Sequence, residues 1–130
     1  MIERVLILKR TEVFRALPEP VLASLARYLE EVNLEAGQEI FRKGDVGKAM
    51  YIVVDGTVRI HDGEKTRALM GPNEVFGERT ALTAEFHRAS ATAAEDCQLL
   101  RLDQDLLYEA MAGNAAIAKG IIKVLLERFQ

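Results

Sequence analysis

The hydrophobic pattern changes period twice along the chain, from helical spacing to strand-like alternation and back again. The first ten residues carry apolar side chains at helical spacing, which predicts a short amphipathic helix. Two prolines, Pro18 and Pro20, then allow a second helix to begin near residue 20, because proline fits a first helical turn. An apolar stripe predicts that this second helix extends over residues 21–31.

The middle of the chain consists of short apolar or alternating runs separated by glycine-containing turns. The continuous apolar run from Ala49 to Val54 predicts a strand buried on both faces. The dipeptide Asp55-Gly56 that follows predicts a tight hairpin. Such short strands, recurring about every eight to twelve residues, are typical of an antiparallel β-roll or jelly roll. The expected strands cover residues 32–35, 39–41, 49–54, 57–61, 66–70, 89–94 and 98–102.

Helical spacing returns after residue 102, where two residues with capping side chains precede apolar stripes. Asp103 is placed to cap a helix over residues 106–111, and Asn114 can cap a last helix that runs to about Phe129. The expected fold is mainly β with flanking helices. It forms one domain over residues 1–130, with helices in 1–31, the roll in 32–102 and helices in 103–130.

Composition and charge narrow the function classes. The chain has 130 residues and a formal net charge of −3, so broad nucleic-acid binding, which needs a basic excess, is not expected. Cys97 is the only cysteine, and its apolar flanks predict a buried structural thiol. No stretch reaches the ~20 apolar residues of a membrane span, and the start lacks a signal-peptide pattern. A cytoplasmic protein without membrane contact is therefore expected.

The sequence has no recognisable catalytic constellation. Its two histidines, His61 and His87, are too far apart for a close metal-binding pair, so no metal site is expected. His61 is predicted to be an exposed strand residue. Nucleophile-elbow, phosphate-loop and paired-cysteine motifs are also missing from the sequence. We therefore expect neither enzyme activity nor a cofactor.

The segment 76–92 has the residues of an anion site between two expected strands. Residues 80–84 can form a helical turn whose free N–H groups point at an anion. Arg88 offers a forked, permanently charged donor to a phosphate, and Glu78 offers an acceptor to a sugar hydroxyl. From these residues alone, the favoured interpretation is a surface loop in which Glu78 and Arg88 merely pair with each other.

Two stretches resemble the cyclic nucleotide-binding domain family, typified by the catabolite activator protein and the regulatory subunit of protein kinase A. The first is the strand-turn-strand pattern of residues 41–60, and the second is 76–92, which is similar to the family's phosphate-binding cassette. The resemblance covers roughly Phe14 to Met111. It implies a ligand site in which Glu78 binds the ribose 2′-hydroxyl and Arg88 binds the cyclic phosphate. The other residues that it implies are Phe76, Gly77, Ala89 and Ser90, with the last two supplying backbone N–H groups.

The resemblance also bears on which nucleotide binds. A hydroxyl directly after the arginine favours cyclic GMP in this family, and this chain has Ala89 there, which favours cyclic AMP over cyclic GMP. Three residues depart from the family pattern: Arg79 and Thr80 after the acid, and His87 where proline is common. Arg79 is expected to face solvent.

The resemblance further implies that the last helix acts as a lid over the bound base and relays occupancy to an effector domain or a second copy of the chain. The lid candidates are Ile121, Ile122, Leu125 and Leu126. Two alternatives stay open. One is a degenerate domain that mediates protein contacts without a ligand. The other is a transcription factor, which is disfavoured because no helix-turn-helix follows the last helix before Gln130.

Overall fold

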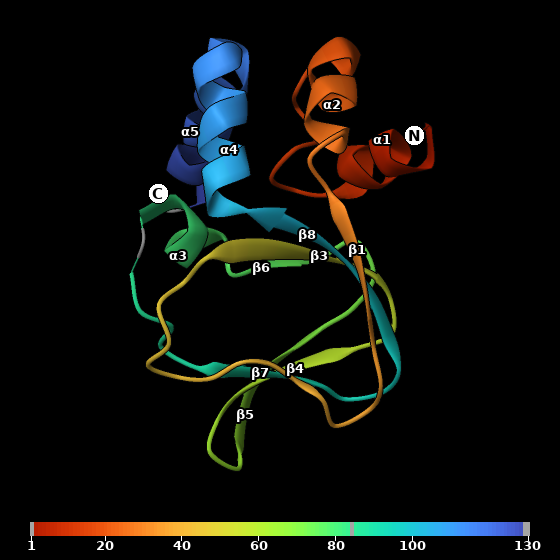
Figure 1. The fold of residues 1–130 in the computed structure, drawn as a ribbon, viewed down its shortest axis with the longest axis vertical. Helices are drawn as coiled ribbons and strands as arrows, with labels where there is room; N and C mark the ends of the chain where they lie inside the picture. Colours follow the sequence, from red (N-terminus) through yellow and green to blue (C-terminus); the bar gives the residue numbers. More distant parts are fainter. Residues whose placement is uncertain (1, 84, 129–130) are drawn as a thin grey trace.

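The computed structural model describes residues 2–83 and 85–128 and contains two four-stranded antiparallel sheets with helices gathered at one end (Figure 1). One sheet has the strand order β1-β8-β3-β6 and the other β2-β7-β4-β5. The strands are β1 (Glu30–Leu34), β2 (Glu39–Phe41), β3 (Ala49–Asp55), β4 (Val58–Asp62), β5 (Lys65–Met70), β6 (Val75–Phe76), β7 (Ser90–Ala93) and β8 (Cys97–Asp103). The helices are α1 (Ile2–Arg10), α2 (Glu19–Ala26), α3 (Glu78–Thr83), α4 (Gln104–Gly113) and α5 (Ala115–Arg128). The expected mainly-β fold with flanking helices is confirmed.

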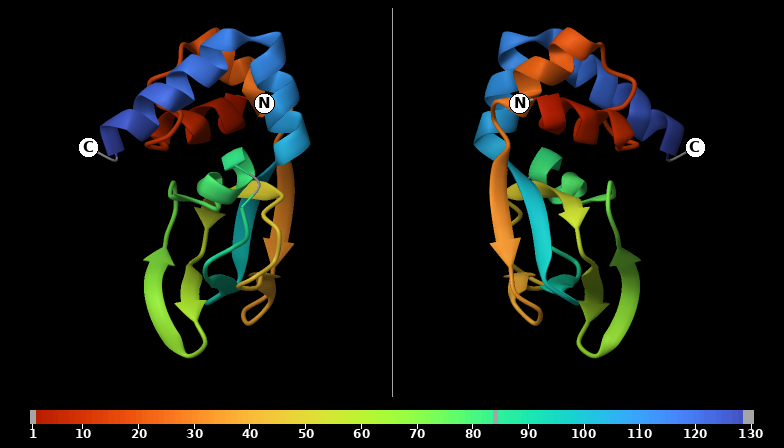
Figure 2. Two further views of the ribbon diagram at one scale, coloured as in Figure 1. Left: turned by 90° about the vertical axis from the view of Figure 1, so that its left-hand side faces the viewer. Right: turned by 90° about the vertical axis from the view of Figure 1, so that its right-hand side faces the viewer.

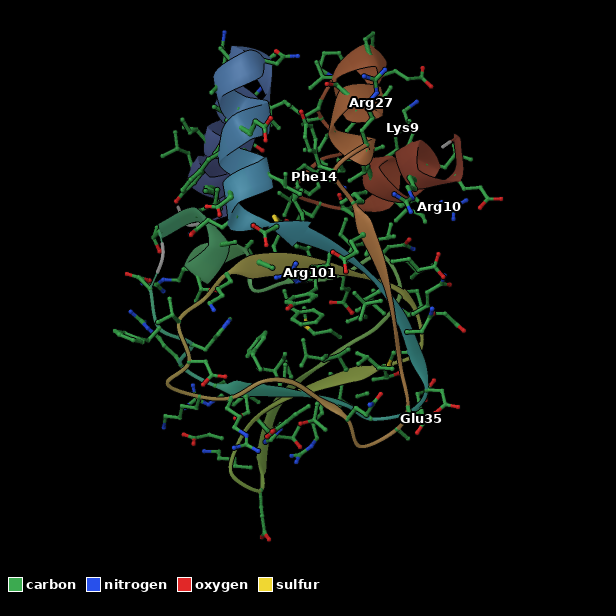
Figure 3. All side chains as sticks on the ribbon, in the orientation of Figure 1. Lys9, Arg10, Phe14, Arg27, Glu35 and Arg101 are labelled. Carbon is green, nitrogen blue, oxygen red and sulfur yellow. The ribbon has the colours of Figure 1, made fainter. Side chains whose placement is uncertain are left out.

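The core has two parts, one on each face of the sheet that contains β3 and β8. Apolar side chains from the helices pack on the outer face around Phe14, which is completely buried (Figure 3). A second cluster that includes Val53, Val58 and Leu99 fills the space between the two sheets. Met50 and Ile52 point to the first cluster while Val53 points to the second. The prediction that this strand is buried on both faces is therefore confirmed.

Capping residues set the ends of the C-terminal helices as expected. The Asp103 carboxylate accepts a hydrogen bond from the Asp105 N–H at 3.0 Å, which begins α4. The Asn114 side-chain oxygen accepts from the Ala116 N–H at 3.0 Å, which begins α5. Phe129, the expected end of the last helix, lies outside the described residues. Figure 2 shows these helices and α1 and α2 gathered at the same end of the roll.

Three local predictions are wrong. Asp55-Gly56 does not close a hairpin, because β3 pairs with β6 and β8 whereas β4 pairs with β5 and β7, so this turn passes the chain from one sheet to the other. The second helix ends at Ala26 rather than residue 31, because Glu30 and Glu31 pair with β8. His61 is half-buried rather than exposed, and its ring bonds the Thr92 hydroxyl at 2.8 Å.

Candidate functional site

The segment between β6 and β7 contains a helical turn, α3, which begins directly after a glycine and two residues before the expected start at residue 80; residue 84, its expected end, lies outside the described residues. Gly77 has φ of +77°, a conformation that favours glycine, and a Cβ there would lie 3.1 Å from the Ala49 carbonyl oxygen. The Gly77 carbonyl accepts hydrogen bonds from the Ala81 N–H at 3.1 Å and the Thr80 hydroxyl at 3.0 Å. These contacts hold the first turn of α3, and with it Glu78, against β3.

The other half of the segment is fixed by the turn between β2 and β3. The Gly47 N–H donates to the Glu85 carbonyl at 3.0 Å, and the His87 N–H donates to the Asp45 carbonyl at 2.8 Å. The Gly44 N–H in turn donates to the His87 carbonyl at 2.8 Å. Residues far apart in sequence thus form a short ladder that ends immediately before Arg88.

The two halves enclose a cavity of about 330 Å³ that opens between α3, the 85–89 segment and the inner face of the roll. Five of the six residues predicted to bind ligand line it: Phe76, Gly77, Glu78, Arg88 and Ala89. Ser90 lies one residue further on in β7, and its hydroxyl accepts a hydrogen bond from the Lys43 N–H at 2.9 Å. The structure therefore brings an acid, an arginine and a glycine turn to one cavity, and their roles toward a ligand remain predictions.

The charged residues differ in how far they reach into solvent. Glu78 is half-buried at the first position of α3, whereas the Arg88 side chain is exposed at the cavity rim. Arg79 pairs with Glu85 at 3.1 Å, and 59% of its side chain is exposed. The prediction that Arg79 faces solvent is confirmed.

Aromatic rings form one wall of the cavity, which the sequence reasoning missed. The His87 ring stacks on Phe41, with centroids 3.5 Å apart and planes 7° from parallel. Phe41 contacts Phe76 at 6.1 Å between centroids, and Phe76 stacks on Tyr51 at 5.2 Å. The sequence did offer a signal, since Phe41 and Tyr51 lie on two expected strands and Phe76 begins the segment 76–92, but only the strand pairing shows that these rings meet.

The four lid candidates on α5 occupy three different environments. Ile121 is buried in the core cluster beneath the helices. Ile122 and Leu126 are exposed to solvent, at 57% and 65%. Leu125 lines a hollow of about 300 Å³ together with α3 residues that include Glu78. The lid role of these residues remains a prediction, and Leu125 is the candidate placed beside α3.

Two hydrogen bonds join α3 to α4. The Gln104 side-chain amide donates to the Ala81 carbonyl at 2.7 Å, and the Tyr108 hydroxyl donates to the Leu82 carbonyl at 2.6 Å. Sequence reasoning gave these two residues no role. Because the bonds are made to the backbone of α3, a displacement of α3 has to be followed by α4 or has to break them.

Three further features bear on metal binding, thiol reactivity and membrane insertion. No group of three or more His, Cys, Asp or Glu side chains there is placed to hold a metal ion. Cys97 is buried as predicted, its thiol donates to the Thr57 and Glu95 carbonyls, and burial raises its pKa, which disfavours the reactive thiolate. Among the described residues, no helix combines the length and apolar character needed to span a bilayer.

Comparison with known proteins identifies the family. Residues 31–114 match the family model described as cyclic nucleotide-binding domain. The matched region runs from β1 to the end of α4 and contains the whole cavity wall described above. The chain belongs to the cyclic nucleotide-binding domain family.

Two of the similar proteins are regulators longer than this chain. The cyclic AMP receptor protein of Thermus thermophilus is 35% identical over 129 residues, which cover 95% of this chain and 59% of that protein. The CRP-like cAMP-activated global transcriptional regulator of Mycobacterium tuberculosis is 29% identical over 129 residues, covering 95% of this chain and 58% of that protein. The chain thus spans a little under three-fifths of the length of these two relatives.

Solved structures agree with the fold. The N-terminal domain of a transcriptional regulator from Streptomyces coelicolor A3(2) superposes with a TM-score of 0.86 and 28% identity, covering 94% of this chain and 91% of that chain. The regulatory domain of Toxoplasma gondii PKA, solved with cAMP, gives a TM-score of 0.77 and 28% identity, covering 84% of this chain and 43% of that chain. The β-roll with flanking helices is thus a shared architecture.

Proposed function

We propose that this chain is a regulatory domain, without enzyme activity of its own, that binds cyclic AMP in the cavity between α3 and Arg88. The observation that carries the proposal is the convergence of Glu78, Arg88 and Ala89 on one cavity in a chain of this family. The cavity volume of about 330 Å³ is within the range of small-molecule sites. Relatives whose names include cyclic AMP support the choice of ligand.

Each group in the cavity matches one part of the nucleotide. The guanidinium of Arg88 can pair with two oxygens of the cyclic phosphate, because its donors form a fixed fork. Backbone N–H groups of Ala89 and Ser90 add further donors. The Glu78 carboxylate accepts from the ribose 2′-hydroxyl. Ala89, which has no hydroxyl for a guanine amino group, favours adenine as the base.

We further propose that ligand occupancy is relayed through α3 to the C-terminal helices. A ligand held by Glu78 acts directly on α3, and α3 is bonded to α4 through Gln104 and Tyr108. Leu125 of α5 lies beside the same helix. If the helices have two positions, a ligand shifts the equilibrium between them only as far as it binds one more tightly than the other. An effector domain or a second copy of the chain would receive the signal.

Calorimetric titration of the purified chain tests the proposal. We expect saturable binding of cyclic AMP, weaker binding of cyclic GMP, and little binding of 5′-AMP, whose acyclic phosphate has a different shape. The absence of heat and of any thermal stabilisation with either cyclic nucleotide would contradict the proposal and leave a protein-interaction module as the function.

Replacing Glu78 with glutamine tests the ribose contact. Hydrogen bonds to charged groups contribute about 1.5–3 kcal/mol, so cyclic AMP affinity should fall by roughly tenfold or more. The decisive readout is selectivity: the wild type should bind cyclic AMP more tightly than its 2′-deoxy analogue, and Glu78→Gln, whose amide oxygen accepts a weaker hydrogen bond than a carboxylate, should show a smaller difference. A selectivity undiminished by the substitution would show that another group recognises the hydroxyl.

A further inference from the structure

The imidazole of His87 is held in a fixed position at the cavity wall. Only 7% of the residue is exposed, and one face of its ring is covered by Phe41 at 3.5 Å between centroids. Its backbone N–H and carbonyl are both bonded at 2.8 Å, to Asp45 and Gly44 of the β2–β3 turn. The ring therefore has little freedom, and its nitrogens stay where the stack places them.

The polar atoms of this ring have no hydrogen-bond partner within the described part of the chain. Among the described residues, no side chain or backbone group forms a hydrogen bond with either nitrogen of His87. Every wholly enclosed side-chain nitrogen or oxygen of the described residues does have a partner. Any hydrogen-bond partner of the His87 nitrogens must therefore come from the open space that the ring lines. That space includes the cavity that contains Glu78 and Arg88, and a shallower hollow beside Lys43.

We propose that His87 is a ligand-contacting residue whose imidazole donates a hydrogen bond to the bound cyclic phosphate and takes up a proton from solvent when the nucleotide binds. The inference rests on the proposed function, because it assumes an anionic nucleotide in this cavity. It adds a titrating group next to Arg88, so that affinity depends on pH. A ring that is held in place, and whose nitrogens reach open space without a hydrogen-bond partner among the described residues, is well suited to this role, since a phosphate oxygen would supply the missing acceptor.

The surroundings of the ring set the sign of the effect. Burial lowers the pKa of the His87 imidazole, and the Asp45 carboxylate opposes this shift to a smaller extent. A phosphate anion placed against the ring acts in the same direction as Asp45 and raises the pKa in the complex. At a pH between the pKa of His87 in the free protein and its pKa in the complex, the imidazole is neutral before the nucleotide binds and protonated afterwards. Affinity then rises as pH falls through this window, by up to about tenfold per pH unit.

Other charged groups surround the same ring. Glu78 and Arg79 come from α3, Glu85 and Arg88 from the segment of His87 itself, and Asp45 and Lys43 from the β2–β3 turn. Histidine is the side chain whose ordinary pKa puts its charge change between pH 5 and 8. His61, the second histidine, is bonded to Thr92 and Gly63 instead and serves as the matched control.

Proton uptake by the wild-type chain is the first test. Titration of cyclic AMP at pH 6–7 in buffers of different ionisation enthalpy gives the number of protons bound, and we expect net uptake. The ring protons of His87, followed by NMR, should titrate at higher pH in the complex than in the free protein. Binding of cyclic AMP without uptake, or with the His87 titration unchanged, overturns the inference while the proposed function stands. No binding at any pH contradicts the proposed function itself.

Two substitutions separate ligand contact from wall packing. His87→Phe keeps an aromatic ring on Phe41 but removes both nitrogens, so affinity at pH 6 should fall about tenfold and proton uptake should vanish. His87→Gln keeps a hydrogen-bond donor that does not titrate, so its affinity should be independent of pH between 6 and 8. His61→Gln should keep the wild-type pH profile. A pH profile that persists in the folded His87 variants assigns the proton to another group and overturns the inference.

Discussion

Arg88→Ala is expected to lower the affinity for cyclic AMP by roughly 10- to 100-fold. Arg88 is exposed at the rim of the cavity, directly after the ladder that joins residues 85–87 to the β2–β3 turn. Backbone hydrogen bonds of the preceding residues therefore fix where the Arg88 backbone lies, while its exposed side chain can turn to a ligand. Loss of a charge-assisted contact worth about 1.5–3 kcal/mol gives the expected range. Calorimetry on the variant measures it.

Two further variants show whether the loss comes from the forked guanidinium of Arg88. Arg67→Ala removes an exposed arginine that pairs with Asp62 on β4, and should leave affinity unchanged. Arg88→Lys keeps the charge but loses the fork, so it should recover only part of the loss. The folded state should persist in Arg88→Ala, because an exposed side chain contributes little to stability. An Arg88→Ala variant with wild-type affinity would place the phosphate elsewhere.

Much of the roll could be predicted because most of its strands show as short apolar or alternating runs in the sequence. The apolar run of β3 is visible in the sequence, and its burial on both faces follows from its lack of alternation. β6 was not predicted, because two residues are too few to show a period. The mistaken hairpin at Asp55-Gly56 has a different cause. The dipeptide specifies a tight turn but not which strands pair on either side of it, and pairing is decided by the whole sheet.

The cavity was predictable only in part. Resemblance located Glu78 and Arg88, and the structure brings both to one cavity. The stack of His87 on Phe41 joins residues 46 positions apart in sequence, and the bonds from Gln104 and Tyr108 join α4 to α3 across more than twenty residues. Such contacts depend on how segments are placed in space. A single sequence with local patterns carries no direct signal of them.

The β2–β3 turn emerges as the element that holds both halves of the site. On one side it forms the ladder with residues 85–87, and on the other it approaches α3. The approach is close at Gly47, where a Cβ would lie 2.1 Å from the Thr80 Cβ and 2.3 Å from its hydroxyl oxygen. Thr80 is itself buried and bonded to the Gly77 carbonyl, so it has little room to give. The glycine thus sets the distance between the turn and the helix that begins with Glu78.

Gly47→Ala is accordingly expected to weaken both stability and binding. The added methyl group has to displace α3 or the turn, and overpacking of this kind costs about 1–3 kcal/mol of unfolding free energy. A displaced α3 moves Glu78 relative to Arg88, so cyclic AMP affinity should fall by about tenfold or more even where the variant is fully folded. Thermal unfolding and calorimetry measure the two effects.

A second substitution and a control identify the cause of the loss. Thr80→Gly removes the side chain that the new methyl group meets, so the double variant should lose less than the sum of the two single variants. Gly113→Ala adds a methyl group at the end of α4, where nothing lies within 4 Å, and should leave both quantities near the wild-type values. Equal losses in Gly47→Ala and Gly113→Ala, or strict additivity with Thr80→Gly, would show that the close approach at Gly47 does not position α3.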